Sequence, residues 1–551
     1  MVVAAVWVQA GLLALPGLAA NAADVKKKGV YDIEPIETEI ITPMSDESGD
    51  FDWVSTLPVF EKPPEVVNPR GREKPLGKPE IPDQFVALEV QAKAAAVRSF
   101  AGLDFAASVG SDGLFRPPDT ILGKSSTYVL EGTNSAIRLM TLTGVNVATK
   151  SLNSFFNADP ITDQVLFDPR IIYDRLGPNQ RFLVVALQRS EAAQTSSILL
   201  AVSKSPNPSN LETTNWCRYR INSLRPDTPV TWADYPMVGV GADAFLISDD
   251  QWTFPDPGPR QYKYGVLRVF NKSSLTNNTT SCPALSMSTF VLPGTEGSTQ
   301  VLGHVQPAIH YTAPTSFPGR MNPTYMVSTV VPSANATYRV WRVANATTGP
   351  TLDVINLTVG TGYATPPRPK QPGGVDLELK DNRIMQVAAR GDTLWAAYST
   401  KCATSFATTK ACIRAVRFFV YESGGTMTAI LQEDLTFASP DTDADKELSY
   451  FMPGITYNAN SSVGIVFLAS GPNQFVSSAW TTKGFLEPFF YGATVFNAGS
   501  CAKGSSRVGD YVGAQTNPDD SVSFWFAGES ALYTPATGQC TWNTKIVEVV
   551  P

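Results

Sequence analysis

The most constraining feature of this sequence is a strand–turn–strand pattern that recurs along most of the chain. It first appears where Asp119 leads into an apolar strand, and a second strand follows a short polar turn and runs toward Gly144. Further units, most with an added outer strand, begin near Phe167, Trp232, Val305, Arg383, Tyr450 and Val508. Their spacing is roughly the 40–50 residues of propeller blades. Repeated antiparallel units with few helices predict an all-β fold of the β-propeller type.

The predicted count is seven blades, with six or eight still open because loop insertions make the spacing irregular. A pair of β-sandwiches is the alternative, since short strands bounded by turns are typical of sandwiches as well. The aspartates that stand at the start of several units favour the propeller.

These aspartates are the first candidates for a functional site. In a propeller the innermost strands begin on one face, beside the central channel, so we expect four carboxylates to meet there: Asp119, Asp168, Asp234 and Asp510. Such a group can cap backbone N–H groups, bind a hard cation such as Ca²⁺, or perform acid–base chemistry with raised pKa values. Capping of the backbone is the preferred interpretation.

Glycoside hydrolysis would require two carboxylates about 5–10 Å apart. The pair to consider is Asp168 and Asp234, on adjacent units. Arginine can bind the carboxylate of an anionic sugar bidentately, and tyrosine can offer a stacking face or a phenol; the candidates are Arg170, Arg175, Arg507, Tyr173, Tyr235 and Tyr511. Packing within the blades is the alternative for each. For an enzyme, the predicted catalytic set is Asp168, Asp234, Arg170 and Tyr235.

Other chemistries have little support in the sequence. The chain contains two histidines, His304 and His310, with no ligating residue at metal-site spacing beside them, so a structural role is expected for both. The G-x-S-x-G pattern is absent. Gly123-Lys124-Ser125 lacks the first glycine of a P-loop, because Pro118 takes its place. The net charge of −7 argues against a nucleic-acid partner.

The first part of the chain differs in composition from the rest. Residues 1–22 resemble a secretory signal, with an apolar run and an A-x-A cleavage site, and a membrane anchor is the alternative. Residues 23–98 are acidic and then proline-rich, which predicts an extended arm. A helix is predicted over Asp83–Arg98, at the end of this arm. The arm is either a flexible linker or a segment that docks on its own body or on a neighbouring subunit. The propeller occupies residues 99–551.

Cysteines and glycosylation triplets indicate an oxidising, extracellular compartment. Three local disulfides are expected among the 15 pairings that six cysteines allow: Cys217–Cys282, Cys402–Cys412 and Cys501–Cys540. Acceptor triplets for N-glycosylation occur at Asn271, Asn277, Asn278, Asn335, Asn345, Asn356 and Asn460. Together with the predicted signal they favour a secreted or cell-surface protein.

Several of these segments resemble a group of secreted, largely uncharacterised β-propeller proteins. The resemblance lies in Pro117-Pro-Asp-Thr with Asn134-Ser-Ala-Ile-Arg, in Asp168-Pro-Arg-Ile-Ile-Tyr-Asp, in Asp234-Tyr-Pro, and in Gly509-Asp-Tyr with Phe524-Trp-Phe. It covers roughly residues 99–550 and implies a fold that is distantly similar to sialidase-like propellers. The S-x-D-x-G-x-T-W pattern of those propellers is absent, and the resemblance therefore does not imply sialidase chemistry.

Two hypotheses on function follow. The first is a binding or structural module that contacts other extracellular proteins, glycans or its own copies, partly through the arm. The second is a carbohydrate-active enzyme with carboxylates at the mouth of the channel. No cofactor other than Ca²⁺ is suggested, and no segment after the predicted signal is long enough to span a membrane. A sealed channel and an arm lodged in another subunit would favour the module, whereas a deep pocket with two carboxylates and an arginine at the channel mouth would favour the enzyme.

Overall fold

The computed structural model describes most of the chain downstream of the arm. The described residues are 35, 37–44, 59–61, 94–106, 114–156, 165–254, 260–276, 281–292, 301–302, 304–314, 322–331, 336–359, 364–379, 382–403, 409–423, 426–440, 448–535 and 538–551. Within them the protein is almost entirely β-structure, as the sequence predicts. The predicted signal segment lies outside the described residues.

The first two sheets are antiparallel and have four strands each. The first contains β5 (Ile121–Lys124), β6 (Tyr128–Gly132), β7 (Ala136–Thr141) and β8 (Asn146–Ser151). The second contains β9 (Val165–Asp174), β10 (Arg181–Ser190), β11 (Thr195–Ser203) and β12 (Trp216–Asn222). In both sheets the strands pair in chain order, with β5 and β9 at the inner edge.

The third sheet gains a strand from the N-terminal part of the chain. It contains β13 (Thr231–Val240), β14 (Ala244–Thr253), β15 (Tyr262–Asn271) and β16 (Leu285–Val291). The short strand β1 (Glu37–Ile41) pairs antiparallel with the outer strand β16, and Ile41 is buried against this sheet. Part of the predicted arm therefore docks on its own body.

The next two groups of strands continue around the molecule. One contains β18 (Gln306–Thr312), β19 (Thr324–Val331), β20 (Ala336–Ala344) and β21 (Thr351–Val359), and β17 (Val301–Leu302) pairs with β19. The other contains β22 (Gln386–Arg390), β23 (Thr393–Ala403), β24 (Thr409–Ser423) and β25 (Thr426–Phe437). Parallel pairing of β13 with β18 and of β18 with β22 joins these groups to the third sheet.

The last two sheets bring the ends of the described chain together. One contains β26 (Ser449–Tyr457), β27 (Val463–Gly471), β28 (Gln474–Lys483) and β29 (Thr494–Asn497). The other contains β30 (Gly513–Thr516), β31 (Phe524–Thr534) and β32 (Gln539–Val550), and its outer strand is β3 (Ala95–Asp104). A separate pair of short parallel strands is formed by β2 (Val59–Glu61) and β4 (Leu114–Arg116).

The strand β3 corrects the predicted helix over Asp83–Arg98. Ala95–Arg98 are in β3, whose backbone pairs with β32 from Ala95 to Asp104, and residues 83–93 lie outside the described residues. Local alanine-rich propensity is overridden here by a long ladder of backbone hydrogen bonds with a distant strand. Helix is confined, among the described residues, to the two single turns α1 (Leu152–Phe156) and α2 (Lys272–Thr276).

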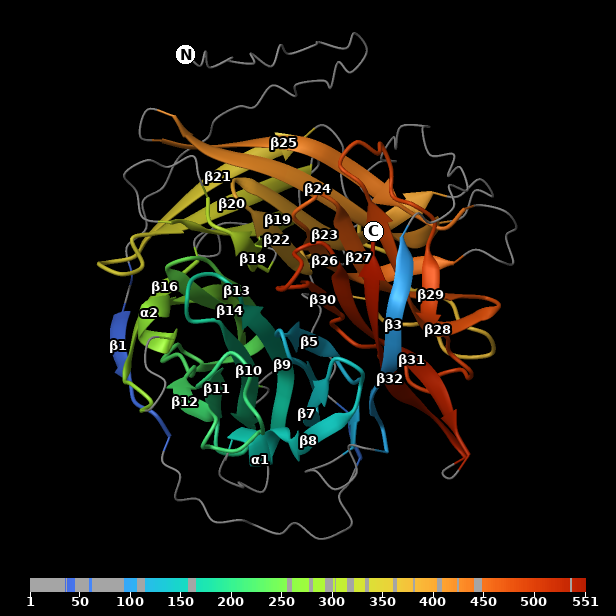
Figure 1. Cartoon of the computed structure of the whole chain (residues 1–551), viewed down its shortest axis with the longest axis horizontal. Helices are drawn as coiled ribbons and strands as arrows, with labels where there is room; N and C mark the ends of the chain where they lie inside the picture. Colours follow the sequence, from blue (N-terminus) through green and yellow to red (C-terminus); the bar gives the residue numbers. More distant parts are fainter. Residues whose placement is uncertain are drawn as a thin grey trace, which may run out of the picture.

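The innermost strands of these groups surround a common centre (Figure 1). They contact one another in the order β5, β9, β13, β18, β22, β26 and β30, and β30 contacts β5. Their starts meet, because the Asp510 N–H donates to Asp119, and so do their ends, because the Lys124 N–H donates to Gln515. The arrangement is therefore β-propeller-like. We call the starts of these strands the leading end and their finishes the trailing end.

Apolar side chains fill the space between neighbouring sheets. One cluster joins the first and second sheets around Phe156, Phe182 and Trp216, and another joins the second and third around Phe245 and Phe270. Because both faces of an interior sheet are covered, strands such as β10 and β14 are buried along their whole length. The stretches Phe182–Leu187 of β10 and Ala244–Ile247 of β14 are accordingly continuous apolar runs rather than alternating patterns.

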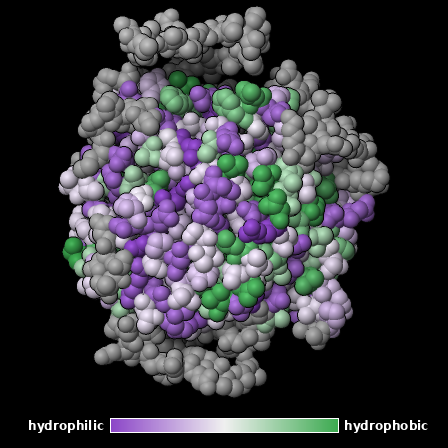
Figure 2. Space-filling model, viewed as in Figure 1, coloured by the Kyte–Doolittle hydropathy of each residue, from purple (hydrophilic) through white to green (hydrophobic). Residues whose placement is uncertain are grey.

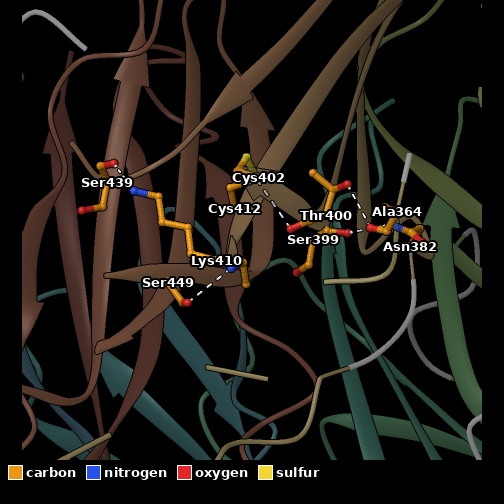
Figure 3. The surroundings of a disulfide bond; sticks show 10 residues. Ala364, Asn382, Ser399, Thr400, Cys402, Lys410, Cys412, Ser439 and Ser449 are labelled. Atoms are coloured by element: carbon orange, nitrogen blue, oxygen red, sulfur yellow. Dashed lines mark hydrogen bonds between the residues drawn. A yellow bond between two sulfur atoms is a disulfide. The ribbon is translucent and has the colours of Figure 1, made fainter. Parts of the chain in front are cut away.

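Each of the three expected cysteine pairs is a disulfide in the structure: Cys217–Cys282, Cys402–Cys412 and Cys501–Cys540. Around Cys402–Cys412, Lys410 Nζ donates to the Ser439 carbonyl at 2.7 Å, and the Ala411 N–H donates to Ser449 Oγ at 3.3 Å (Figure 3). These contacts connect the β23–β24 hairpin to the residues just after β25 and to β26.

The surface is mixed in character. Figure 2 shows hydrophilic and hydrophobic residues interspersed over the face in view. Among the described residues, no helix has the length and apolar character needed to cross a membrane.

Candidate functional site

The leading end is built on a bulge that recurs in several inner strands. In β9, β13 and β26 two residues oppose one on the partner strand, and in each case the bulged pair ends in proline: Asp168-Pro169, Tyr235-Pro236 and Met452-Pro453. Proline is tolerated in an inner strand at such a place because a bulge interrupts the hydrogen-bond ladder. The first residue of each pair has a positive φ of 51–54°. Asp119 before β5 has a φ of 49°.

This geometry corrects the alignment of the units. The sequence equates Asp119, Asp168, Asp234 and Asp510, whereas the structure places Tyr235 and Met452 at the position of Asp168. Asp234 lies one residue earlier, in the regular ladder opposite Asp250. The repeated element is therefore a backbone bulge, and its side chain is an aspartate in only some of the strands.

Asp119 joins the first and last sheets of the ring. Its carboxylate accepts a hydrogen bond from Asn134 Nδ2 at 2.8 Å and another from the backbone N–H of Asp510 at 2.6 Å. The amide oxygen of Asn134 in turn accepts from the Asp168 N–H at 2.8 Å, which extends the connection to the second sheet. Asp119 thus caps a backbone N–H group, as the preferred interpretation of the sequence expects. Asn134 is a part of this network that the sequence did not single out.

Arg170 packs among the aromatic rings of the leading end. Its guanidinium carbon lies 3.2 Å from the centroid of the Tyr511 ring and 5.4 Å from that of Tyr235, and its Nε donates to the Pro236 carbonyl at 2.7 Å. Arg383 stacks on Tyr235 as well, at 4.6 Å. Burial, together with the nearby Asp168 charge, raises the pKa of Tyr511. The tyrosines therefore act as packing partners for arginine.

Asp168 and Asp234 face a common arginine. Burial lowers the pKa of Arg189 to about 10, the neighbouring Arg260 adds to this, and Glu191, Asp234 and Asp168 oppose it. The Arg189 guanidinium also lies 3.9 Å from the centroid of the Trp232 ring. The two carboxylates are thus within electrostatic reach of one buried cation.

The three arginines suggested for an anionic sugar do not converge. Arg170 and Arg507 are at the leading end, and Arg175 follows β9 at the trailing end. Arg507 donates to Asp510 at 3.4 Å. Burial opposes its charge, but the attraction of Asp510, Asp119 and other acids raises the pKa of Arg507. Tyr173 lies within β9, where its hydroxyl donates to Gln180 at 3.1 Å.

The leading-end residues are shielded from solvent. Asp119, Asp168, Asp234, Arg170, Tyr235, Arg383, Arg507, Asp510 and Tyr511 are each at most 7% exposed. A glycosidase must admit a sugar ring between its two carboxylates. The burial of the candidate pair and of the groups around it therefore disfavours the open pocket that the enzyme hypothesis requires.

Both histidines are buried within the fold. His304 forms an ion-pair contact with Asp250, and its ring centroid lies 5.2 Å from that of Tyr235. The Nε2 atom of His310 accepts the Tyr325 N–H at 3.2 Å, and burial lowers the pKa of His310 to about 3. Asp250 is 54 positions away from His304 in the sequence (304 − 250), which is why spacing did not reveal this contact.

A metal site at the leading end receives no support from the geometry. Among the described residues, no group of three or more His, Cys, Asp or Glu side chains is placed to hold a metal ion. Asp119, Asp168, Asp234 and Asp510 therefore do not form the oxygen-rich cage that Ca²⁺ would need.

Four of the acceptor asparagines are among the described residues. Asn460 is exposed in a turn, and Asn271, Asn345 and Asn356 are half-buried. Asn356 is in β21, where its side-chain oxygen accepts from Arg339 Nε at 3.0 Å. Asn277, Asn278 and Asn335 lie outside the described residues.

Comparisons with known proteins give no family. No protein family matches the sequence, and no curated protein matches it. Among solved structures, Trypanosoma rangeli sialidase in complex with 2,3-difluorosialic acid is 10% identical, with a TM-score of 0.37, over 76% of this chain and 56% of that chain. A protein of unknown function from Dyadobacter fermentans is 9% identical, with a TM-score of 0.23, over 83% of this chain and 99% of that chain. The chain spans just over half the length of the sialidase, and these similarities are too low to assign an activity.

Proposed function

We propose that this protein is a secreted, seven-bladed β-propeller that serves as a binding or structural module in an extracellular or cell-surface assembly. The blade count rests on the inner strands β5, β9, β13, β18, β22, β26 and β30, which contact one another in sequence and return to the first. In this proposal β3 completes the last blade, so that a strand preceding the first blade closes the ring.

The observation that carries the proposal is the use of the leading-end charges. The Asp119 carboxylate is bonded to Asn134 and to the backbone of Asp510, and Arg170 Nε donates to the Pro236 carbonyl, although Arg170 Nη2 is buried without a hydrogen-bond partner. Groups that are buried and engaged in joining sheets are not arranged to meet a substrate. In this proposal the buried groups hold the sheets of the ring together, and partners bind at the outer surface of the ring.

Three further elements complete the proposal. Residues 1–22 act as the signal segment, residues 23–98 as the arm and residues 99–551 as the propeller. The three disulfides support an oxidising compartment, because such bonds persist outside the cytosol. The acceptor asparagines carry glycans at the rim, and the partners are other extracellular proteins, glycans or further copies of this chain. Kinship with the secreted propellers of unknown activity belongs to the same proposal.

The test is a hydrolysis assay on panels of neutral and anionic glycosides, combined with binding to a glycan array, on the purified secreted chain. We expect no turnover from the wild type. Asp168→Asn should lower the stability of the protein, and Asp376→Asn, which removes an exposed carboxylate, should change nothing.

Turnover that is abolished by Asp168→Asn in a folded protein, and retained by Asp376→Asn, would reject the module and establish the carbohydrate-active enzyme. The Asp168 and Asp234 carboxylates, with Arg170 and Tyr235, would then be the residues to assign.

A further inference from the structure

At the trailing end, Arg175 and Arg390 form no ion pair with a carboxylate in the part of the chain that the structure describes. Arg175 follows β9, and its Nη1 and Nη2 atoms donate to the Asn517 carbonyl at 3.2 Å and to Ser521 Oγ at 2.6 Å. Arg390 is the last residue of β22, and its Nε and Nη2 atoms are buried without a hydrogen-bond partner. Buried donors without a partner are rare, since each one loses its hydration without a replacement.

The unpartnered atoms of Arg390 are on one edge of the guanidinium group. Nε and Nη2 together form the side-on fork that a carboxylate or a tetrahedral oxyanion contacts with two parallel hydrogen bonds. The side chain as a whole is half-buried, whereas the Nε and Nη2 atoms themselves are covered, so an anion must enter beside the exposed part of the side chain to reach them. The Arg390 guanidinium carbon lies 5.8 Å from the centroid of the Tyr311 ring.

The Tyr311 side chain connects three of the innermost strands at the trailing end. Its hydroxyl accepts from Thr456 Oγ1 at 2.9 Å and from the Thr516 N–H at 3.4 Å, so β18 is joined to β26 and β30. Because both contacts use the oxygen as an acceptor, the hydroxyl hydrogen can still donate. Tyr311, whose ring lies near Arg390, therefore has a hydroxyl that can act as a further donor.

The nearby acids have other partners. Asp519 pairs with Lys124. Asp520 accepts from the N–H groups of Val522 at 2.7 Å and Ser523 at 3.0 Å, and from the hydroxyl of Ser523. Burial lowers the pKa of Arg390, and the charge of Arg175 lowers it further, so the two cations are within electrostatic reach of each other. An anion between them would offset their mutual repulsion.

We propose that Arg390 and Arg175, together with the Tyr311 hydroxyl, form a binding site for one small oxyanion at the trailing end of the ring. The anionic group is a sulfate, a phosphate or a carboxylate, either as a free ion or as a substituent of a sugar. The inference goes beyond the binding module proposed above and does not depend on it.

The experiment measures the thermal unfolding temperature of the full chain in sodium sulfate and in sodium chloride at equal ionic strength. The wild type should be stabilised by sulfate in a saturable way, which gives an apparent Kd. Arg390→Gln should weaken that Kd about ten- to hundredfold, because it removes a charged, bidentate contact. Arg390→Lys keeps the positive charge but lacks the two-atom fork. Its apparent Kd for sulfate should therefore lie between those of the wild type and of Arg390→Gln. Arg368→Gln removes an exposed arginine and should respond as the wild type does.

The second readout is stability without sulfate. Arg390→Gln should then melt at or above the wild-type temperature, because one of two repelling charges is gone; a clear fall would mean that Arg390 is a structural contact and would overturn the site. Equal responses to sulfate and chloride in the wild type would mean that water occupies the site, and would also overturn it. A sulfated monosaccharide is tested beside free sulfate. Tighter binding of the sugar would indicate that the site takes an anionic substituent of a sugar, and tighter binding of sulfate would indicate that it takes the free ion.

Discussion

The two ends of the inner strands are both rich in charge and in tyrosine, but they use these groups differently. At the leading end Asp119 is bonded to Asn134 and to the Asp510 backbone, and Arg170 is enclosed by Tyr235 and Tyr511. At the trailing end Arg390 keeps two buried donors without partners. Residue type alone therefore does not identify a binding site. What distinguishes the ends is that Arg390 leaves a whole edge of its guanidinium group, Nε and Nη2, without partners, whereas Arg170 uses its Nε and leaves only Nη2.

The largest expected effect on stability comes from the protonation of His310, which lies in β18 near the trailing end. The pKa of His310 is lowered to about 3 by burial, whereas an unfolded histidine has its usual value of 6.5. The folded pKa is the lower one, so the stabilisation is present above pH 6.5 and is lost as the pH falls from 6.5 toward 3. Linkage gives a loss on the order of 4 kcal/mol between pH 7 and pH 3.

The measurement is the free energy of unfolding by denaturant across this pH range. His310→Asn, whose side-chain oxygen can still accept the Tyr325 N–H, should show a shallower decline than the wild type. Parallel curves for the two proteins would mean that His310 is not the group that makes the trailing end sensitive to acid.

The next effect is at the leading end. Asp119→Ala removes the acceptor for Asn134 and for the Asp510 N–H, and it places alanine at a φ of 49°. Unsatisfied buried donors and an unfavourable backbone angle should together cost about 2–4 kcal/mol.

Asp119→Asn is the matched control, because asparagine keeps one acceptor oxygen and tolerates positive φ. It should recover part of the loss in chemical denaturation. If Asp119→Ala lowered the free energy of unfolding no more than Arg390→Gln does at the opposite end, the proposed difference between the two ends would be wrong.

Much of the fold could be predicted from the sequence, and the reason is the uniform packing of the sheets. Apolar strands and tight turns recur wherever an inner strand must be covered on both faces, so β9, β13 and β26 were all recognised. The bulges were not, because Tyr235 and Met452 share a backbone conformation with Asp168 but not its chemistry. The available signal was a proline one residue later in each strand, at Pro169, Pro236 and Pro453.

The candidate site was predicted less well, since its contacts join residues distant in the chain. Asp119 and Asp510 are separated by 391 positions (510 − 119), and Arg175 contacts Asn517 and Ser521 from the opposite end of the sequence. Arg390 and Tyr311 had no local motif that could mark them. The same limit applies to Ala95–Arg98, where pairing with β32 outweighs a helical composition.

A smaller effect is expected at Glu131, a buried carboxylate near the leading end. Glu131 accepts from the Leu103 N–H at 2.7 Å and from the hydroxyls of Thr120 and Thr544 at 3.3 Å and 2.5 Å. Burial raises the pKa of Glu131 above its ordinary value despite these bonds. Its folded pKa exceeds the unfolded one, so its stabilisation is present in acid and is lost as the pH rises through the folded value.

Glu131→Gln should remove this dependence, and at acid pH it should alter stability by no more than about 1 kcal/mol. Unfolding curves at several pH values test it. A mutant that loses stability with rising pH as steeply as the wild type would show that the dependence comes from another group.

The smallest effect concerns carboxylates at the rim, where solvent replaces most lost contacts. A hydrogen bond with Glu37, with burial second, raises the pKa of Glu39 in β1 to about 7. The raised pKa means that the folded position of Glu39 in β1 favours its protonated form, so this contribution to stability is present below about pH 4.5 and disappears as the pH rises through 7. Both side chains are largely hydrated, so the change should stay below about 1 kcal/mol.

Hydrogen exchange at the Ile40 and Ile41 amides should therefore quicken above pH 7, after correction for intrinsic exchange, in the wild type but not in Glu39→Gln. Equal exchange in both proteins would place the anchoring of β1 in Ile41 and the Arg225–Glu37 ion pair instead, because these contacts do not titrate in that range.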